Sequence, residues 1–432
     1  MIKVSIICMI YKSTKFAKWV YDSVQKYTPM LKRGEAEFFF VANDPTVEVV
    51  DFLREKKYPF IVTLHEHLSA EELAELGIEN REYLRRVYQA WNQGIFHAKG
   101  QMVCLINSDN YFSENWLENM MKYSNYNTCV VPQLVEPLQR GKDLFWCALH
   151  AEFGHLPEEF KEDDFIAYAD KVRMTGIRNL GVFQPCLLYK DVAICAGLYP
   201  EGNRINADGT ITTGDTAFCN QLMKMNVKHI TALDSVVYHM GEGELLDRSA
   251  QEDNMCDKEY AQEEYVPMYK AIPHFVLENI GMELPQTENA ERIYERLLVP
   301  YHNNPQVDKL CDNFKEMVFG SEKGHKLYLF CAGANGRRLH KNLLIRGLEA
   351  DAFSDNNPKL WDTYIDNIKC IAPQELEKDS VIIVTKDEPE EIVQELRIKG
   401  YKRVLTYQEL KKDIDGTPAA YDEKVVKSWK AN

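Results

Sequence analysis

Residues 83–110 read YLRRVYQAWNQGIFHAKGQMVCLINSDN, and this stretch decides the fold class. Its first half places apolar residues on one face at helical spacing, which predicts a helix over 83–97. The run 102–106 is entirely apolar and predicts a buried strand. That strand ends in the polar sequence NSDN at 107–110, which is typical of a turn. A helix followed by a buried strand and a polar turn indicates an α/β protein with a mostly parallel sheet.

The same alternation extends over residues 1–245. Further strands are predicted at 4–10, 37–42, 60–64, 129–135, 183–189 and 235–238, and further helices at 15–27, 46–56 and 215–225. The segment 145–170 is rich in aromatic and acidic residues and gives no clear prediction. Because ligands of parallel sheets bind beyond the carboxyl ends of the strands, the polar turns at 43–46 and 107–110 mark the expected site.

The rest of the chain divides into three parts. Residues 246–322 have helical periodicity, with helices predicted at 258–269, 290–298 and 307–319. Residues 251–300 hold 11 acidic and 4 basic residues, which favours a solvated connector over an acidic recognition surface. A second, smaller α/β domain is predicted at 323–412, and a polar tail follows at 413–432.

Composition limits the class of protein. A length of 432 residues predicts two or three domains. The net charge of −15 argues against general affinity for nucleic acid or anionic lipid. No apolar run reaches the roughly 18 residues of a membrane span. The 11 cysteines are scattered without a CxxC pair, as in a reducing compartment, so a cytoplasmic location is expected.

The turn at 107–110 carries the clearest chemistry. Mg²⁺ and Mn²⁺ prefer oxygen ligands and bind diphosphates through one or two carboxylates and the phosphate oxygens. A carboxylate directly after a buried strand, as at Asp109, suits that role. The pattern alone leaves a second interpretation open, in which Asp109 only stabilises a turn.

Six motifs, taken in order, resemble those of a family 2 glycosyltransferase with the GT-A fold. They are VSIICMIY at 4–11, FVANDPT at 40–46, WNQGIFHAKG at 91–100, NSDN at 107–110, TGDTAF at 213–218 and DSVVYH at 234–239. The resemblance implies an inverting transfer of a sugar, of the hexosyltransferase type, from a nucleotide-diphosphate donor to a saccharide or lipid-linked acceptor in surface polysaccharide or glycan synthesis. It also implies Mg²⁺ or Mn²⁺ as cofactor.

The sequence lacks the Gln-x-x-Arg-Trp motif of the processive, membrane-embedded synthases of this family. The resemblance therefore favours a single-addition enzyme in the cytoplasm, with peripheral contact to the inner face of the membrane left open. It gives no indication of the oligomeric state.

The resemblance assigns a donor-nucleotide site at the strand ends. The turn after the second strand matches the one that holds the base and ribose, and the backbone at the end of the first strand lines the same pocket. The residues assigned to donor binding are Ile10, Tyr11, Asn43, Asp44, Asn92 and Ser108.

The resemblance also assigns a metal site and a base. Asp109 matches the last carboxylate of an Asp-x-Asp motif, with Asn107 where the first Asp is usual, and His239 matches a histidine that contacts metal or diphosphate. Asn107 offers an oxygen without charge, which weakens the expected metal site. Asp215 matches the catalytic base. Taken alone, a histidine at the end of a strand is more often structural. Asp215 also fits a helix N-cap, a role that is compatible with that of a base.

The C-terminal block contains CAGANG at 331–336, a G-x-G-x-x-G fingerprint with Cys at its first position. Gly333, Gly336 and Asp355 are the candidate nucleotide-binding residues, and the block resembles Rossmann-like domains of sugar-nucleotide-modifying enzymes. Two alternatives to a single transferase activity remain at this point. One is a nucleotide-sugar-binding scaffold with a decayed transferase domain, and the other is a bifunctional chain whose C-terminal domain binds a (di)nucleotide.

Overall fold

The computed structural model describes residues 2–410 except 66, 77–81, 139–146, 197, 200–203, 206–210, 213, 225–226, 242–253, 267–304, 321–324, 345–347 and 366–367. Contacts divide the chain into two compact units, the first mainly residues 1–193 and 210–268 and the second mainly residues 269–432. The predicted helix at 290–298 and the tail at 413–432 lie outside the described residues.

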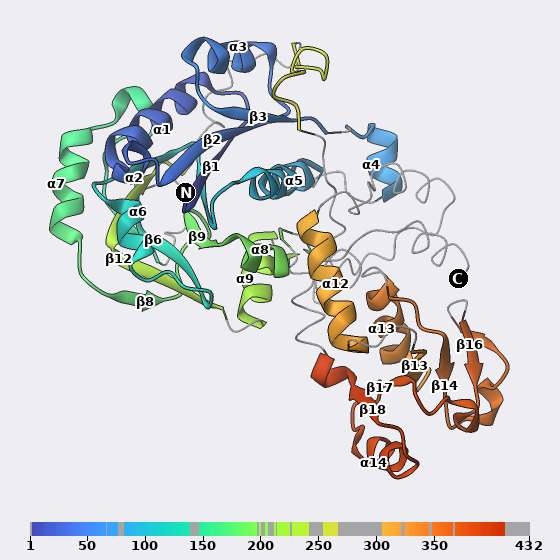
Figure 1. Ribbon diagram of the computed structural model, residues 1–432. Helices are drawn as coiled ribbons and strands as arrows, with labels where there is room; N and C mark the ends of the chain where they lie inside the picture. The colour runs from blue at the N-terminus through green and yellow to red at the C-terminus, as the bar shows by residue number, and fades with distance from the viewer. Residues whose placement is uncertain are drawn as a thin grey trace. The chain divides into compact units, whose positions relative to one another are not determined.

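The first unit is built on a ten-stranded sheet (Figure 1). Its main path runs β3-β2-β1-β4-β9-β6-β12-β5, with β7 beside β6 and β8 beside β12. The strands are β1 (Val4–Ile10), β2 (Ala36–Asn43), β3 (Phe60–Thr63), β4 (Met102–Asn107), β5 (Asn110–Phe112), β6 (Thr128–Glu136), β7 (Leu149–His150), β8 (Ile177–Asn179), β9 (Cys186–Tyr189) and β12 (Lys228–His239).

Strand direction brings several carboxyl ends to one edge of this sheet. Strands β1 to β4 are parallel, and Met9 pairs with Asn107 in register. Strand β9 is antiparallel both to β4 and to β6, so β6 runs in the same direction as β4. Strand β12 is parallel to β6, with Tyr238 opposite Val135. The ends of β2, β4, β6 and β12 therefore share the edge at which ligands bind in such sheets.

Helices cover both faces of the sheet (Figure 1). In the first unit they are α1 (Thr14–Tyr27), α2 (Pro29–Lys32), α3 (Val47–Lys56), α4 (Ala70–Leu76), α5 (Glu82–His97), α6 (Trp116–Met121), α7 (Glu162–Val172), α8 (Lys190–Cys195), which reaches into the second unit, and α9 (Gly214–Lys224). Helix α1 packs through Tyr21 on Phe38 and Phe40 of β2. Gly94 of α5 lies so close to Val41 that a Cβ would come within 2.9 Å of its side chain. Because successive strand residues point to opposite faces, α1 and α5 lie on opposite sides of β2.

The segment that the sequence left without a prediction forms a short 3₁₀ turn, η1 (Pro157–Glu159), and helix α7. Phe165 of α7 is fully buried and contacts Tyr238 of β12, with 5.7 Å between ring centroids. Aromatic packing of this kind holds α7 on the sheet.

Residues 254–266, which the sequence places in the connector, pack with the first unit instead. The backbone N–H of Val62 in β3 donates to the carbonyl of Glu264, and the carbonyl of Val62 accepts the backbone N–H of Val266. The Arg54 guanidinium also pairs with the Glu264 carboxylate at 2.7 Å. The predicted helix at 258–269 is therefore wrong over its described part, which forms turns along the edge of β3. An apolar i, i+4 pattern fits a strip packed on a sheet edge as well as a helix.

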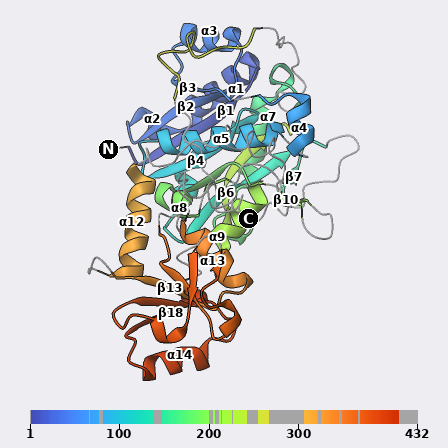
Figure 2. The same ribbon diagram turned by 90° about the vertical axis from the view of Figure 1, so that its right-hand side faces the viewer.

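The second unit contains a smaller sheet, which includes β13 and β18 (Figure 2). Its strand order is β15-β16-β14-β13-β17-β18, and all neighbours are parallel except β15 and β16. Its strands are β13 (Leu327–Phe330), β14 (Ala352–Ser354), β15 (Tyr364–Ile365), β16 (Ile368–Ile371), β17 (Val381–Val384) and β18 (Arg403–Thr406). Its helical elements are α12 (Pro305–Phe319), α13 (Ala334–Leu344), α14 (Glu390–Ile398), η3 (Pro358–Leu360) and η4 (Pro373–Glu375). A separate pair of short strands, β10 (Arg204–Ile205) and β11 (Ile211–Thr212), completes the described elements.

Two apolar clusters show that the second sheet is covered on both faces. Leu329 packs with Phe314 of α12 and Leu339 of α13, whereas Phe330 packs with Leu396 of α14. In chain order the parallel strands lie 3-2-1-4-5, which is the order of doubly wound nucleotide-binding sheets. The predicted second α/β domain is thus present.

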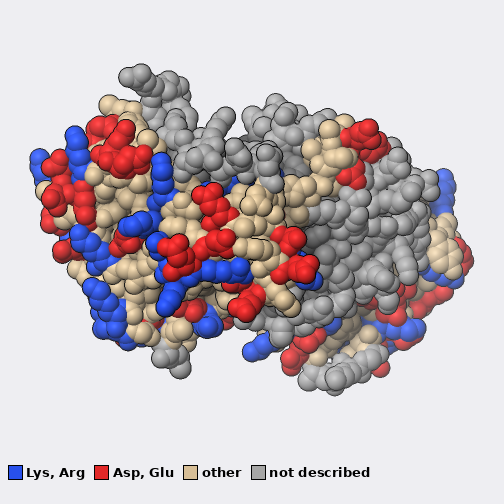
Figure 3. All heavy atoms as spheres, turned by 90° about the horizontal axis from the view of Figure 1, so that it is seen from above, with Lys and Arg blue, Asp and Glu red and all other residues tan. Residues whose placement is uncertain are grey.

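On the described part of the face drawn in Figure 3, acidic and basic side chains are interspersed. Among the described residues, no helix combines the length and apolar character needed to cross a membrane.

Candidate active site

The turn after β4 is held by its own side chains. The backbone N–H of Asn107 donates to Oδ1 of Asn110 at 2.8 Å, and Asp109 is 7% exposed. The carbonyl of Asp109 accepts the N–H of Met240 at 3.1 Å, which ties the turn to the end of β12. The turn predicted at 107–110 therefore lies next to the predicted His239.

His239 joins two carboxylates at this edge. Its Nε2 lies 3.2 Å from Oδ2 of Asp109, and its Nδ1 lies 2.6 Å from Oε1 of Glu136. Burial lowers the pKa of His239, but the charge of Asp109 and hydrogen bonds to both carboxylates outweigh burial and raise it to about 10. Without a cation, the charged His239 ring therefore balances part of the negative charge of the Asp109 and Glu136 carboxylates.

The chemistry of these groups fits a divalent cation that arrives with a diphosphate. Two neighbouring ligands of an octahedral ion, each about 2.1 Å from it, lie about 3 Å apart, close to the separation of His239 Nε2 and Asp109 Oδ2. Among the described residues, no group of three or more His, Cys, Asp or Glu side chains is arranged to hold a metal ion. Asn107 is the half-buried last residue of β4, two residues before Asp109, and carries an amide oxygen that could serve as a further ligand.

Asp44, at the end of β2, is the centre of a second group. Its Oδ2 lies 2.9 Å from Nη1 of Arg86 and 3.2 Å from Nε2 of His67, and its Oδ1 accepts the N–H of His65 at 2.8 Å. Asp44 adopts a φ of 44°, in the left-handed region, so its turn is sharply bent. The structure thus places a buried carboxylate held by Arg86 where the resemblance expects base and ribose.

The other residues predicted for the donor differ in accessibility. Tyr11 is 36% exposed, whereas the side chain of Ile10 is buried, so Ile10 can offer only its backbone. Asn43 is buried beside the Thr63 hydroxyl, with 3.5 Å between the oxygens. Asn92 in α5 and Ser108 in the turn are also buried. Direct contact with a donor stays a prediction for all of them.

Asp215 is the second residue of α9, so it lies inside the first helical turn. Gly214 makes this placement possible, because a Cβ there would lie 2.4 Å from the Tyr88 ring of α5. Burial raises the pKa of Asp215 to about 6, and the hydrogen bond from Nε2 of Gln184, at 3.2 Å, lowers it only in part. A carboxylate with this pKa is ionised at neutral pH and is basic enough to accept a proton.

The structure therefore groups the predicted residues into a His239–Asp109 pair, an Asp44 cluster and a separate Asp215. Sequence reasoning missed five of their partners: His65, His67, Arg86, Glu136 and Gln184. A signal existed for Glu136, because it directly follows the predicted strand 129–135, as Asp44 and Asp109 follow theirs.

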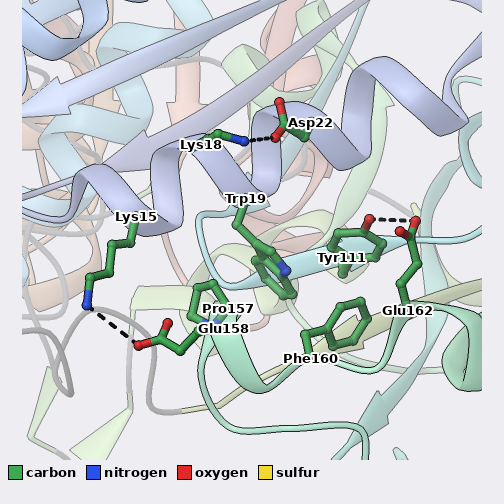
Figure 4. Close-up of a pocket in the computed structure, with 9 residues that line it drawn as sticks. All are labelled: Lys15, Lys18, Trp19, Asp22, Tyr111, Pro157, Glu158, Phe160 and Glu162. Atoms are coloured by element: carbon green, nitrogen blue, oxygen red, sulfur yellow. Dashed lines mark hydrogen bonds and ion pairs between the residues drawn. The ribbon is translucent and has the colours of Figure 1, made fainter.

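A pocket of about 590 Å³ between α1 and residues 157–162 has a different character (Figure 4). Its aromatic wall is formed by Trp19, Tyr111 and Phe160, whose ring centroids lie 4.5 to 5.3 Å apart. The Tyr111 hydroxyl donates to Glu162 at 2.7 Å, and Glu162 also accepts from Lys26 and Tyr27. None of the predicted site residues lines this pocket, and its Glu162 carboxylate already accepts three hydrogen bonds.

In the second unit, the fingerprint turn and Asp355 lie together. A Cβ on Gly336 would come within 2.2 Å of the Cys331 carbonyl, whereas one on Gly333 would meet nothing within 4 Å. The Asp355 carboxylate accepts the backbone N–H groups of Ala332 and Asn357 at 2.9 and 2.8 Å. The turn has the tight approach that the fingerprint requires, and nucleotide binding by Gly333, Gly336 and Asp355 stays a prediction.

Comparison with known families finds a match within the first unit. Residues 70–190 match the family model Glycosyl transferase family 2. The matched range includes α5, β4 and the turn with Asp109. This part of the first unit therefore matches the same family that the six motifs resemble. No curated protein matches the chain in sequence.

Three solved structures are similar to the chain. GalNAc-T7 with UDP, GalNAc and Mn²⁺ is 13% identical with a TM-score of 0.37, over 55% of this chain and 44% of that one. The mannosyltransferase PcManGT from Pyrobaculum calidifontis, in complex with GDP-Man and Mn²⁺, is 13% identical with a TM-score of 0.35, over 55% and 56%. Residues 1–349 of TarS from S. aureus are 12% identical with a TM-score of 0.35, over 80% and 86%.

The chain spans only about half the length of the first two structures. All three TM-scores lie below 0.5, so the similarity to glycosyltransferases rests on the family match alone.

Proposed function

We propose that this protein is an inverting, divalent-cation-dependent glycosyltransferase that moves a sugar from a nucleotide-diphosphate donor to a saccharide or lipid-linked acceptor. The observation that carries the proposal is the His239–Asp109 pair, 3.2 Å apart at the carboxyl edge of a family 2 domain. We further propose that the transferred sugar is a hexose and that the enzyme acts in surface polysaccharide synthesis at the cytoplasmic side of the membrane.

Each group of residues has a role in this reaction. Asp44, held by Arg86, would accept hydrogen bonds from the base or ribose of the donor. Asp109 and His239, with Asn107 beside them, would hold Mg²⁺ or Mn²⁺ against the diphosphate. When bound, the cation neutralises charge on the leaving diphosphate.

Asp215 would act as the base. The acceptor oxygen forms a bond to the anomeric carbon on the face opposite the diphosphate, while the bond from that carbon to the phosphate oxygen breaks. The hydroxyl proton passes to the Asp215 carboxylate, and the nucleoside diphosphate leaves with the bond electrons. One displacement inverts the anomeric configuration.

A panel of nucleotide sugars tests the proposal, with donor hydrolysis and transfer measured with and without Mn²⁺. We expect one donor class to be consumed, with release of a nucleoside diphosphate that depends on Mn²⁺. Cation-independent binding of a nucleotide sugar without turnover would instead support the scaffold alternative, in which Asn107 marks a decayed metal site.

A further inference from the structure

Glu136 is the residue of this edge that the proposed reaction does not yet use. It is the last residue of β6, and its carboxylate, with 14% of the side chain exposed, lies 2.6 Å from Nδ1 of His239. Tyr238 and Val135 are opposite each other in the parallel β6–β12 pair, so Glu136 and His239 follow at the same level. The contact is therefore fixed by the sheet register.

The backbone of Glu136 is also held from the other side. Strand β7 pairs with it, with His150 opposite Glu136, and the N–H of Ala151 donates to the Glu136 carbonyl at 3.1 Å. Because the backbone of Glu136 is held on both sides, its carboxylate stays close to the His239 ring. This distinguishes Glu136 from Glu152, which pairs with His155 at 3.1 Å through side chains that are both about half exposed.

The contact determines which ring nitrogen is available. A histidine that donates its Nδ1–H to a carboxylate presents Nε2 as the ligand atom, and such partners are the usual second layer of histidine–metal sites. Here Nε2 faces Asp109 Oδ2 at 3.2 Å, so the ring is already turned toward the position between them.

We propose that Glu136 is a positioning residue of the cation site: it holds the His239 ring with Nε2 directed at a divalent ion shared with Asp109. The inference rests on the proposed function, since that function places the cation there. Loss of a carboxylate partner of this kind typically weakens metal affinity about 10- to 100-fold.

The test measures Mn²⁺ binding to the full chain by the electron paramagnetic resonance signal of free Mn²⁺, with UDP and GDP as separate probes. For Glu136→Gln we expect the dissociation constant of Mn²⁺ to rise about 10- to 100-fold, and for His239→Ala at least as much. Glu152→Gln is the matched control and should bind Mn²⁺ like the wild type.

The melting temperature and a second variant distinguish a positioning role of Glu136 from a purely structural one. If Glu136 only ties β6 to β12, Glu136→Gln lowers the melting temperature and leaves Mn²⁺ affinity unchanged, which overturns the proposal. Glu136→Asp, which keeps the charge but draws it back by one methylene, should bind Mn²⁺ with affinity between the wild type and Glu136→Gln, and it serves if the Gln variant does not fold.

Failure of the proposed function looks different. If the wild type binds no Mn²⁺ with either probe, the cation dependence itself fails, and the role of Glu136 fails with it. If the wild type binds Mn²⁺ and Glu136→Gln binds it equally well, only the role of Glu136 is wrong.

Discussion

The two α/β sheets of this protein place an acidic residue at the same position, yet the surroundings of the two residues differ. Asp44 follows the second strand of the first sheet, and Asp355 follows the second strand of the other. Asp44 is paired with Arg86 and His67, side chains that can rearrange toward a ligand. Asp355 is held by two backbone N–H groups, that of Asn357 in its own turn and that of Ala332 in the glycine turn after β13.

The neighbouring strands extend this difference. The first edge adds His239, whose two ring nitrogens lie 3.2 Å from Asp109 and 2.6 Å from Glu136. The second edge adds a tight glycine turn, in which Gly336 lies against the Cys331 carbonyl. The first edge thus brings together ionisable side chains from several strands, whereas at the second edge backbone groups make the contacts to Asp355.

The largest effect is expected at Asp215. Asp215→Asn removes the proton acceptor, so kcat for sugar transfer should fall about 10²- to 10⁴-fold. Transfer is measured with the donor that the panel identifies. Asp163→Asn, an exposed carboxyl in the first turn of α7, is the control and should transfer normally. Full activity of Asp215→Asn would exclude it as the base.

The same variant should be more stable, not less, at neutral pH. Burial raises the pKa of Asp215 from 3.8 to about 6, so its ionisation favours the unfolded state and native stability is lost as pH rises through 6. Asp215→Asn should therefore raise the free energy of unfolding by about 1 to 3 kcal/mol at pH 8 and leave it little changed at pH 3. Denaturant titration at the two pH values checks this, and lower stability at pH 8 would contradict it.

Donor binding should depend next on Arg86. Arg86→Ala leaves the buried Asp44 carboxylate without its closest cation, and we expect donor affinity to fall about 10- to 100-fold, or about 1.5 to 3 kcal/mol. Calorimetry with the donor and Mn²⁺ measures this. Arg54→Ala, which breaks the ion pair between Arg54 of α3 and Glu264, should bind the donor normally. If Arg86→Ala binds the donor as tightly as Arg54→Ala does, Asp44 and Arg86 are not part of the donor site.

The pH profile should report the same base. Because Asp215 must be ionised to accept a proton and its pKa is about 6, kcat should fall about tenfold per pH unit below 6 and level off above it. The profile is recorded at saturating donor and Mn²⁺. A flat profile between pH 5 and 8 would contradict the assignment.

The smallest effect on transfer is expected from the second edge. Gly336→Ala places a Cβ 2.2 Å from a backbone carbonyl and should destabilise the protein by about 1 to 3 kcal/mol. Gly333→Ala, whose Cβ meets nothing within 4 Å, is the matched control and should be nearly neutral. Both variants should bind the donor and Mn²⁺ like the wild type. If only Gly336→Ala loses this binding, the donor site lies in the second unit and not in the first.

Much of the sheet could be predicted because its strands are apolar throughout. Val4–Ile10 was predicted to the residue, since every side chain in it is apolar except one serine. Strand β12 was predicted only at 235–238 although it runs Lys228–His239, because Lys228, His229 and Asp234 interrupt the apolar pattern. Asp234 tolerates its place in the strand by pairing with Lys122 at 2.9 Å.

The site was predictable only where a residue carries its own signal. Asp44 and Asp109 stand in polar turns after apolar strands, so the topology alone indicates that they share an edge. Arg86 and Gln184 carry no such signal, because their contacts with Asp44 and Asp215 join segments far apart in sequence. Long-range side-chain pairs of this kind depend on the packed structure.

The central claim is that the first edge, not the second, binds a sugar nucleotide together with a divalent cation. Calorimetry of the full chain with the identified nucleotide sugar, with and without Mn²⁺, tests it directly in the wild type, Asp109→Asn and Asp355→Asn. We predict Mn²⁺-dependent binding that Asp109→Asn loses and Asp355→Asn keeps. Binding that survives in Asp109→Asn and disappears in Asp355→Asn would contradict the account.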